Sequence, residues 1–449
     1  MEVVYPHCAA LDVHKKTVTA CCVHSRGGRP QVQTRTFGTT TRELLQLRDW
    51  LQAEGCTHIA MESTGVYWQP VYNLLEGSAE LLLVNAQHVK YVTGRKTDVR
   101  DAAWLAELLR HGLLQPSFVP PQPQRDLRDL TRNRAVLVGA RAAVVNRVQK
   151  VLEGANLKLA SVASDVVGAS GRAILAELLA GEEDPAVLAQ LARGRLREKR
   201  AALEAALEGR VRAHHRFLLV QHLAHLDFLD EQVAHYDAQI EAHLIAPDAE
   251  PPPAVPGGRD PHPVAPPATP QRPRREPEAP LSYAAAVALL DPIPGVAVRG
   301  AQAILAEIGT DMGRFASARH LASWAGMAPG NNESAGKRRS GKTTGGNAAL
   351  KKALTQAAHG AKQTKGSYFA ALYQRLAGRR GKRRAIVAVG HALLVVIYHL
   401  LRYQEPYRDL GRDYYDARRQ ESLVARLVHR LAQLGYRATV ELQAGAVAP

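Results

Sequence analysis

Residues 3–38 read VVYPHCAALDVHKKTVTACCVHSRGGRPQVQTRTFG, and this stretch decides the fold of the N-terminal part of the chain. It contains three runs rich in β-branched and apolar residues, at 3–13, 17–24 and 31–37, the last two separated by the turn Ser25-Arg26-Gly27-Gly28. Such runs bounded by turn residues predict strands. Helical patterns at 41–52, 67–75 and 97–113 then alternate with strand patterns at 58–61 and 81–84. Residues 1–115 are therefore predicted to form an α/β domain with a mixed sheet and flanking helices.

The rest of the chain predicts helices. From 125 to 245 the pattern is almost purely helical, with breaks near Gly154, Gly168 and Asp184-Pro185. Stretches such as 191–211 predict long helices, and the sequence leaves open whether they form a helical bundle or a dimerising coiled coil. Residues 246–281 hold 13 of the 26 prolines and predict a linker, because polar, Pro-rich chain cannot bury a core. Residues 282–435 predict a last helical domain, so the fold class is α/β plus all-α.

The charge of the chain predicts a polyanionic partner. Among 449 residues, 58 are Lys or Arg and 42 are Asp or Glu, a net charge of +16, and 46% hydrophobic residues exclude global disorder. Residues 334–404 contain 15 Lys or Arg and no acidic residue, which favours a phosphate-contacting surface over a merely solvated face. Aromatic residues are only 5% and are not interleaved with the basic clusters. This favours backbone contacts to duplexes or structured RNA over a stacking platform for single strands.

Neither a membrane nor an oxidising compartment is expected. The longest apolar run, 385–401, is interrupted by His391 and His399 and is predicted to be a buried helix. The first residues lack the basic segment of a secretory signal. The four cysteines form no CxxC pair, so we expect reduced, buried thiols in a cytoplasmic protein.

Four carboxylates stand at ordered places in the N-terminal pattern. Asp12 lies in the first strand pattern and Glu62 directly follows a second, and an acidic residue in apolar surroundings is costly unless something pairs it. Asp98 and Asp101 are three residues apart at the start of a predicted helix and share a face. Taken singly, Glu62 is explained by a surface turn, and Asp98 and Asp101 are explained by the favourable interaction of acidic residues with the N-terminal end of a helix dipole. The ordered set of four predicts a site for two hard cations such as Mg²⁺.

A glycine turn lies upstream of the basic stretch. Ile293-Pro294-Gly295-Val296 precedes the helical run 301–309. A tight turn that opens a helix offers backbone N–H groups to phosphate, so this is a candidate helix-hairpin-helix-like element. An ordinary corner between two helices gives the same pattern.

Taken together, these motifs resemble the DEDD-type transposases of insertion-sequence family 110, which are related to the pilin-gene invertases. The resemblance rests on motifs in matching order that cover most of residues 5–115 and 285–402. In the N-terminal part they are LDVHKKT at 11–17, ESTG at 62–65, NAQHVK at 85–90 and GRKTDVRDA at 94–102. In the C-terminal part they are IPGV at 293–296, FASARHLASWAGMAP at 315–329, ESAGK at 333–337 and GGN at 345–347.

The resemblance implies a RuvC-like domain of RNase H fold, a coiled-coil region and a compact transposase domain. Asp12, Glu62, Asp98 and Asp101 would bind Mg²⁺, or Mn²⁺ in its place. Ser334 would be the nucleophile and form a 5′-phosphoserine, with Ser340 as the next candidate. Alanine stands at 335, where many relatives have glycine. A structured guide RNA would pair with donor and target double-stranded DNA, and two dimers would form a tetramer.

Several basic residues flank these motifs and are candidates for nucleic-acid contacts: Lys15, Lys16, Arg95, Lys96, Arg100, Lys337, Arg338, Arg339, Lys342, Lys351, Lys352, Arg383 and Arg384. The first functional hypothesis is an RNA-guided recombinase, acting in the cytoplasm on the DNA of a bacterial or archaeal nucleoid. The phosphoserine would hold the energy of the broken bond, so strand exchange would need no ATP. The alternative is a RuvC-like, metal-dependent junction nuclease that uses the carboxylates and water. A non-catalytic nucleic-acid-binding protein is disfavoured, because carboxylates beside a basic surface repel the ligand unless a cation lies between them.

Overall fold

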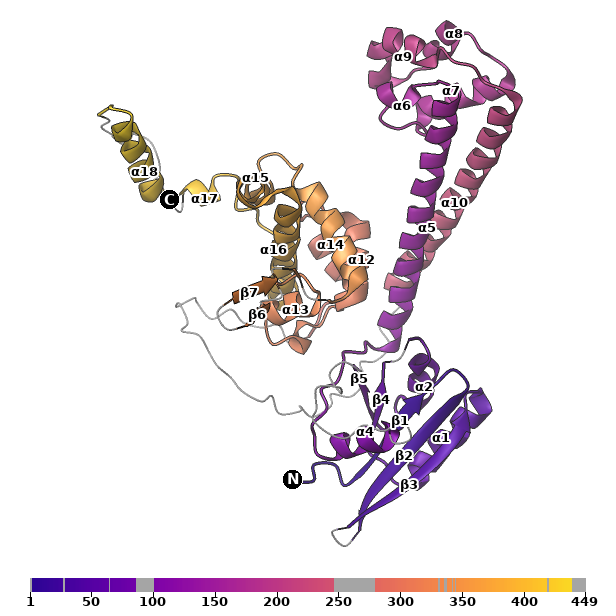
Figure 1. Ribbon diagram of the computed structural model, residues 1–449, viewed down its shortest axis with the longest axis vertical. Helices are drawn as coiled ribbons and strands as arrows, with labels where there is room; N and C mark the ends of the chain where they lie inside the picture. Colours follow the sequence, from indigo (N-terminus) through magenta and orange to yellow (C-terminus); the bar gives the residue numbers. More distant parts are fainter. Residues whose placement is uncertain are drawn as a thin grey trace. The chain divides into compact units, whose positions relative to one another are not determined.

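A computed structural model describes residues 2–26, 29–63, 65–85, 101–245, 279–329, 332–334, 337–340, 342–343, 345–417 and 420–437. These form two compact units, residues 1–120 and 121–449 (Figure 1). The predicted linker lies outside the described residues except for its last three positions, and Arg95, Lys96, Asp98 and Arg100 also lie outside them.

The first unit is built on a five-stranded sheet of order β3-β2-β1-β4-β5. Its strands are β1 (His7–Val13), β2 (Thr17–Arg26), β3 (Arg29–Gly38), β4 (His58–Glu62) and β5 (Glu80–Val84). The β1–β2 and β2–β3 pairs are antiparallel, whereas β4 is parallel to both β1 and β5. Its helices are α1 (Thr41–Ala53), α2 (Trp68–Leu75) and α4 (Asp101–Arg110). The predicted mixed sheet with flanking helices is confirmed.

One strand boundary differs from the prediction. The sequence predicts the first strand from residue 3, but β1 begins at His7. Pro6 has no amide hydrogen to give to a sheet, and the amides of Val4 and Tyr5 instead donate to the carbonyl of Arg110, at 2.9 and 3.1 Å.

The two faces of the sheet have separate apolar cores. One core holds Leu11 and Met61 together with side chains of α1 and α2. The other holds Ala10 and Ala60 together with Leu105 and other side chains of α4. Each core side chain follows the alternation of the pleat, which sends neighbouring residues of a strand to opposite faces.

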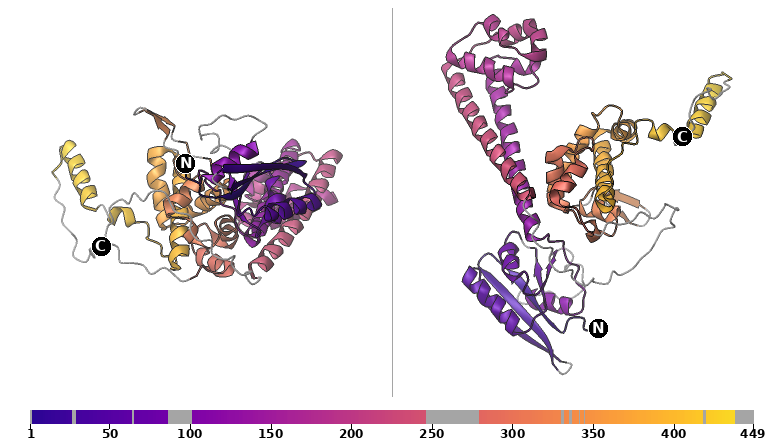
Figure 2. Two further views of the ribbon diagram at one scale, coloured as in Figure 1. Left: turned by 90° about the horizontal axis from the view of Figure 1, so that it is seen from below. Right: turned by 180° about the vertical axis from the view of Figure 1, so that it is seen from behind.

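The second unit begins with two long helices that pack against each other, α5 (Gln122–Gly154) and α10 (Ala213–Ile245) (Figure 2). Arg134 pairs with Asp237, and Arg141, seven residues later, pairs with Asp230, seven residues earlier. Because the paired residues advance along α5 while they go back along α10, the two helices are antiparallel.

Short helices join the far ends of this pair. They are α6 (Leu159–Val162), α7 (Ala169–Ala180), α8 (Pro185–Gln190), the 3-10 helix η2 (Gly194–Lys199) and α9 (Arg200–Leu207), and they share a core with α5 and α10. The predicted long helix over 191–211 is therefore wrong. Gly194, the first residue of η2, has φ +54°, a left-handed conformation that an α-helix excludes, so no helix runs from 191 through this position.

Most of the remaining helices pack around α16 (Lys382–Tyr403), and the last two follow it along the chain. They are α11 (Tyr283–Leu290), α12 (Ala297–Ile308), the 3-10 helix η3 (Met312–Arg314), α13 (Ala318–Trp324), α14 (Ala348–Ala361), α15 (Tyr368–Arg380), α17 (Tyr414–Ala417) and α18 (Gln420–Gln433). By length and composition α16 is apolar enough to cross a membrane. Nevertheless, Val389, Leu393 and Ile397 are fully buried among the other helices, which confirms the predicted buried helix.

A two-stranded sheet interrupts these helices, although the sequence predicts helices alone in this domain. Its strands are β6 (Asn332–Ser334) and β7 (Lys337–Ser340). These strands are short and polar, so they lack the apolar alternation by which a strand is identified in a sequence.

Candidate functional site: a carboxylate-bearing sheet edge and a serine-bearing hairpin

Asp12 and Glu62 lie side by side at one edge of the sheet. The parallel strands β1 and β4 pair from Cys8 with His58 to Leu11 with Met61, so the next position on each strand is Asp12 and Glu62. Two residues at the carboxyl ends of adjacent parallel strands are neighbours in space. Residues 50 apart in the chain are thus brought together by strand pairing.

Both carboxylates belong to the face that α4 covers. Ala10 and Ala60 are buried against α4, and Asp12 and Glu62, two residues further along each strand, lie on the same face. The Cys8 thiol lies 3.9 Å from the carbonyl of Ala106, and the last residue of α4 contacts the chain before β1. Helix α4 therefore runs antiparallel to β1, and its first residue, Asp101, belongs to the end that carries Asp12 and Glu62.

The carboxylate side chains do not converge on one point. The Asp12 carboxylate is 3.1 Å from Nε2 of His14, and no three His, Cys, Asp or Glu side chains within the described ranges lie close enough together to hold a metal ion. Asp98 lies outside those ranges. The oxygen donors present are nonetheless the type that Mg²⁺ selects, so the chemistry of this edge fits a hard cation.

Two of the predicted nucleic-acid contacts adjoin this edge. Lys15 and Lys16 are exposed in the turn between β1 and β2, directly after the strand that carries Asp12. The turn is closed by a 2.9 Å hydrogen bond from the His14 amide to the Thr17 carbonyl. Positive charge is therefore fixed next to the carboxylates.

Ser334 belongs to the second unit, on the β6–β7 hairpin. It is the last residue of β6 and pairs with Lys337, the first residue of β7, while Glu333 pairs with Arg338. Arg339 follows on β7. The predicted nucleophile and three predicted cations thus occupy one antiparallel ribbon.

The base of this hairpin is attached to the helical body. Pro329 and Thr343 form an isolated antiparallel bridge, and Lys351 of α14 donates to the Thr343 hydroxyl at 2.7 Å. A Cβ on Gly346 would lie 2.4 Å from the amide nitrogen of Gly326, so the backbones of the two glycines are in direct contact. A larger side chain at 346 would push the base of the hairpin away from α13.

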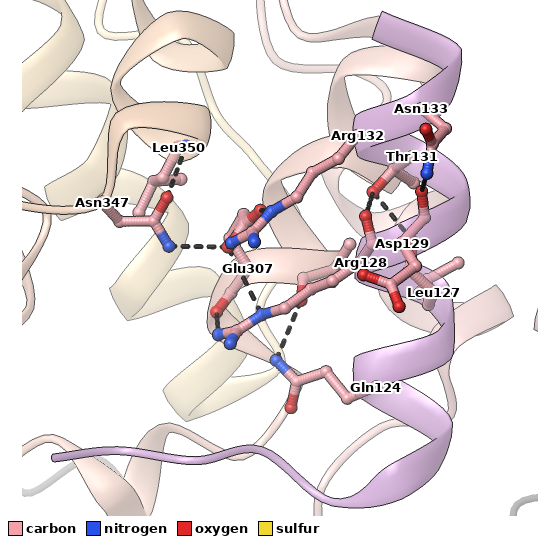
Figure 3. A network of polar contacts seen from close by, with 11 residues as sticks. Gln124, Leu127, Arg128, Asp129, Thr131, Arg132, Asn133, Glu307, Asn347 and Leu350 are labelled. Atoms are coloured by element: carbon pink, nitrogen blue, oxygen red, sulfur yellow. Dashed lines mark hydrogen bonds and ion pairs between the residues drawn. The ribbon is translucent and has the colours of Figure 1, made fainter. Parts of the chain in front are cut away.

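A buried carboxylate ties α14 to the long helix α5 (Figure 3). Glu307, at the end of α12, is 2% exposed and accepts hydrogen bonds from Nε and Nη2 of Arg132 at 2.7 and 2.8 Å. Nε of Arg128 lies 3.3 Å from the same carboxylate. Nδ2 of Asn347 donates to it at 2.6 Å, and Oδ1 of Asn347 caps α14 by accepting from the Leu350 amide at 3.0 Å.

The charges of this network are settled by its contacts. Burial lowers the pKa of the Arg128 guanidinium to about 10, which keeps it protonated at neutral pH, and the hydrogen bond with Glu307 raises the pKa of Arg132. Sequence analysis missed this network. The signal was available, because Glu307 is the one acidic residue in the apolar run 301–309.

The glycine of the predicted helix-hairpin-helix-like element is explained by packing. Gly295 lies between α11 and α12 with φ +81°, and a Cβ there would lie 2.2 Å from the carbonyl oxygen of Ala357 on α14. A Cβ on Gly360 of α14 would in turn lie 2.9 Å from the Cα of Gly295. Close contact with α14 accounts for this glycine, so its presence gives no support for phosphate binding.

The other predicted contacts are spread over the helical body. Lys342 is exposed, Lys352 is exposed on α14, and Arg383 and Arg384 are exposed in the first turn of α16. Lys351 is half-buried on α14, and its amine donates to the Thr343 hydroxyl.

Comparison with known proteins places both units in one family. Residues 9–157 match a family described as transposase, of the DEDD type of IS110, and residues 287–374 match the family described as transposase of the IS116/IS110/IS902 family. A comparison with curated protein sequences gives no match. The two family matches lie in chain order and together span the sheet edge with Asp12 and Glu62 and the hairpin with Ser334. The chain is a transposase of the IS110 family.

Proposed function

We propose that the protein is an RNA-guided DNA transposase that exchanges strands through a 5′-phosphoserine at Ser334. The observation that carries this proposal is the placement of Asp12 and Glu62 on adjacent strand ends, on the face where α4 begins with Asp101. Family membership supports a DNA substrate.

The N-terminal unit has the features expected of a RuvC-like domain. Three antiparallel strands are followed by two parallel ones, in the order β3-β2-β1-β4-β5, and we infer an RNase H fold from this order and the carboxylate positions. We assign residues 1–115 to this domain, 125–245 to a helical/coiled-coil region, 246–281 to a linker and 282–435 to the domain that supplies the nucleophile.

Asp12, Glu62, Asp98 and Asp101 are the residues that would hold the metal. When bound, Mg²⁺ or Mn²⁺ would polarise the scissile phosphate and favour ionisation of the attacking hydroxyl. The protein's own contribution is to position the nucleophile. Ser334 Oγ forms a bond to phosphorus, the bond from phosphorus to the 3′ oxygen breaks, and that oxygen leaves as a 3′-hydroxyl after taking up the serine proton through solvent.

The phosphoserine keeps the energy of the broken bond. A 3′-hydroxyl from another strand attacks the phosphorus, restores a phosphodiester and releases Ser334, so no nucleotide triphosphate is consumed. Lys337, Arg338 and Arg339, on the strand that pairs with β6, would stabilise the charge that develops on the phosphate.

The partners we propose are a structured guide RNA and donor and target DNA duplexes, bound by dimers that assemble into a tetramer in the cytoplasm. The net charge of +16 supports polyanionic partners. Lys15, Lys16, Arg95, Lys96, Arg100, Lys342, Lys351, Lys352, Arg383 and Arg384 are the remaining contacts that we assign to them.

A covalent trapping experiment tests the mechanism. The protein is co-expressed with the RNA transcribed from the flank of its own element and given target DNA nicked just past the cleavage position, which prevents religation. The wild type should give a protease-sensitive protein–DNA adduct with a blocked 5′ end. Ser334→Ala should give none, whereas Ser340→Ala should still give it. Normal cleavage by Ser334→Ala with free 5′-phosphates would instead establish a metal-dependent nuclease of junction-resolvase type.

A further inference from the structure

A basic cavity lies in the second unit, away from the β6–β7 hairpin in the sequence. It measures about 800 Å³ and is bounded by the turn after α14 at 362–367, by α15, by residues 412–415 and by Arg426 of α18. This volume is within the range of about 300–1,000 Å³ that is usual for ligand sites.

The lining of this cavity is strongly cationic. Its basic side chains are Lys362, Lys365, Arg375, Arg379, Arg412 and Arg426, and its one acidic side chain is Asp413. Asp413 pairs at 3.2 Å with its neighbour Arg412, and both side chains point mostly into solvent, with 78% and 75% exposed. Five positive charges therefore remain in excess around one concave surface, which selects a ligand with several negative charges.

Tyrosine rings hold two of these cations in place. The guanidinium of Arg375 lies 5.0 Å from the ring centroid of Tyr415, and the amine of Lys362 lies 5.3 Å from that of Tyr373. The Tyr415 hydroxyl donates to that of Tyr368 at 2.7 Å, and burial raises the pKa of Tyr415, which keeps its ring neutral. A guanidinium fixed over an aromatic ring presents a planar fork, the geometry that suits phosphate oxygens.

The start of α15 does not supply the anion site. Ser367 already accepts from the Ala370 amide at 3.2 Å, and Asp409 accepts from the Tyr368 amide at 2.8 Å. Since these helix amides are occupied, the basic side chains themselves must bind the ligand.

We propose that this cavity binds the phosphodiester backbone of a nucleic-acid strand, as a contact site additional to the residues identified from the sequence. The proposal rests on the proposed function, because a transposase that works with RNA and DNA provides the polyanion. Tyr415 and Arg375 come from segments 40 residues apart, so interleaving of aromatic and basic residues is present in the tertiary structure although the sequence lacks it.

Binding of labelled nucleic acids tests the proposal. The full-length protein is titrated with a fluorescein-labelled RNA hairpin and, separately, with a labelled DNA duplex, and anisotropy is followed over a range of salt concentrations. The test variant is Arg375→Gln/Arg379→Gln. The control is Arg42→Gln/Arg48→Gln, which makes the same charge change on α1 of the first unit. Thermal melting establishes that each variant is folded, and Arg379→Gln alone replaces the double variant if it is not.

Loss of two phosphate contacts should weaken binding of at least one probe about tenfold and reduce the slope of log K against log salt by about 1.4–1.8, relative to the control. For Arg379→Gln alone, the slope should fall by about half of that amount. Reduction for the RNA probe only would identify the guide as the occupant, and reduction for the duplex only would identify the DNA. An affinity and slope equal to the control for both probes would overturn the proposal. Competition with polyglutamate gives a second outcome that would overturn the proposal. If polyglutamate displaces both probes from the wild type at lower concentrations than unlabelled RNA does, and this advantage is absent in the test variant, the occupant is an acidic polypeptide.

The adduct assay separates this proposal from the proposed function. Ser334→Ala should bind both probes like the wild type. If the wild type forms no covalent adduct but the cavity variant loses binding, the phosphoserine mechanism fails and the cavity site remains. If adducts form and the cavity variant binds normally, the phosphoserine mechanism stands and the cavity site is wrong.

Discussion

Variants of Glu307 and Asn347, which exchange the carboxylate and the amide of the buried network, test whether this network fixes α14 to α5. Asn347→Asp keeps an oxygen that caps α14, and Asp is as good an N-cap as Asn. It removes the 2.6 Å hydrogen bond to Glu307 and puts a second carboxylate beside the first. A hydrogen bond to a charged group is worth about 1.5–3 kcal/mol. Two like charges about 4 Å apart repel by about 4 kcal/mol at an effective dielectric constant of ~20.

The two guanidinium groups offset part of this repulsion, so we expect Asn347→Asp to lower the free energy of unfolding by about 3–5 kcal/mol. At roughly 2–4 °C per kcal/mol for a domain of this size, the melting temperature should fall by about 10 °C. Glu307→Gln leaves Arg128 and Arg132 without a counter-charge and should cost about 3–5 kcal/mol as well.

The double variant Glu307→Gln/Asn347→Asp restores the charge balance and reverses the hydrogen bond, because the amide introduced at position 307 can donate to the carboxylate introduced at position 347. It should be at least about 2 kcal/mol more stable than the sum of the single changes predicts. Calorimetry gives the stabilities, and hydrogen exchange of the amides of 345–352 reports whether the start of α14 has loosened.

Ser317→Asp is the matched control, since Ser317 caps α13 by accepting from the His320 amide at 3.3 Å. It should change the stability by less than about 0.5 kcal/mol. A melting temperature for Asn347→Asp within about 2 °C of the control, or strictly additive losses in the double variant, would refute the reasoning.

Four further outcomes are expected. Asp12→Asn should abolish adduct formation while RNA binding stays within about twofold, and wild-type activity in excess EDTA would contradict this. Arg383→Ala/Arg384→Ala should reduce the salt slope of nucleic-acid binding by about 1.4–1.8, and an unchanged slope would assign these residues to a solvated face. Replacing residues 247–280 by a shorter Gly/Ser segment should preserve strand exchange, and loss of activity in a folded variant would show a role for the segment. All four cysteines are buried, and burial raises the pKa of the Cys8 thiol to about 12, so the thiols should be inaccessible to Ellman's reagent at pH 8 until urea is added.

The sequence by itself determined the elements of the first unit and the order of its carboxylates. Strands and helices there have clear periods of 2 and 3.6, and turn residues such as Ser25 separate them. The breaks expected near Gly154, Gly168 and Pro185 coincide with the end of α5 and with the starts of α7 and α8. Local chemistry can be predicted wherever one segment decides its own conformation.

Only the tertiary structure decided which residues meet. Glu307 finds Arg132, 175 residues away, and Asn347, 40 residues away, and no local pattern encodes either partner. In the sequence, Gly295 fits a phosphate-binding turn or a packing contact equally well, and only the close approach of α14 reveals the packing reason for this glycine. The charge pattern identified Arg383 and Arg384 but not the cavity around Arg375, because that cavity exists only where α15 packs against 412–415. A sequence specifies the conformation of each segment through short-range sterics, whereas a buried ion pair or a binding cavity depends on how distant segments pack.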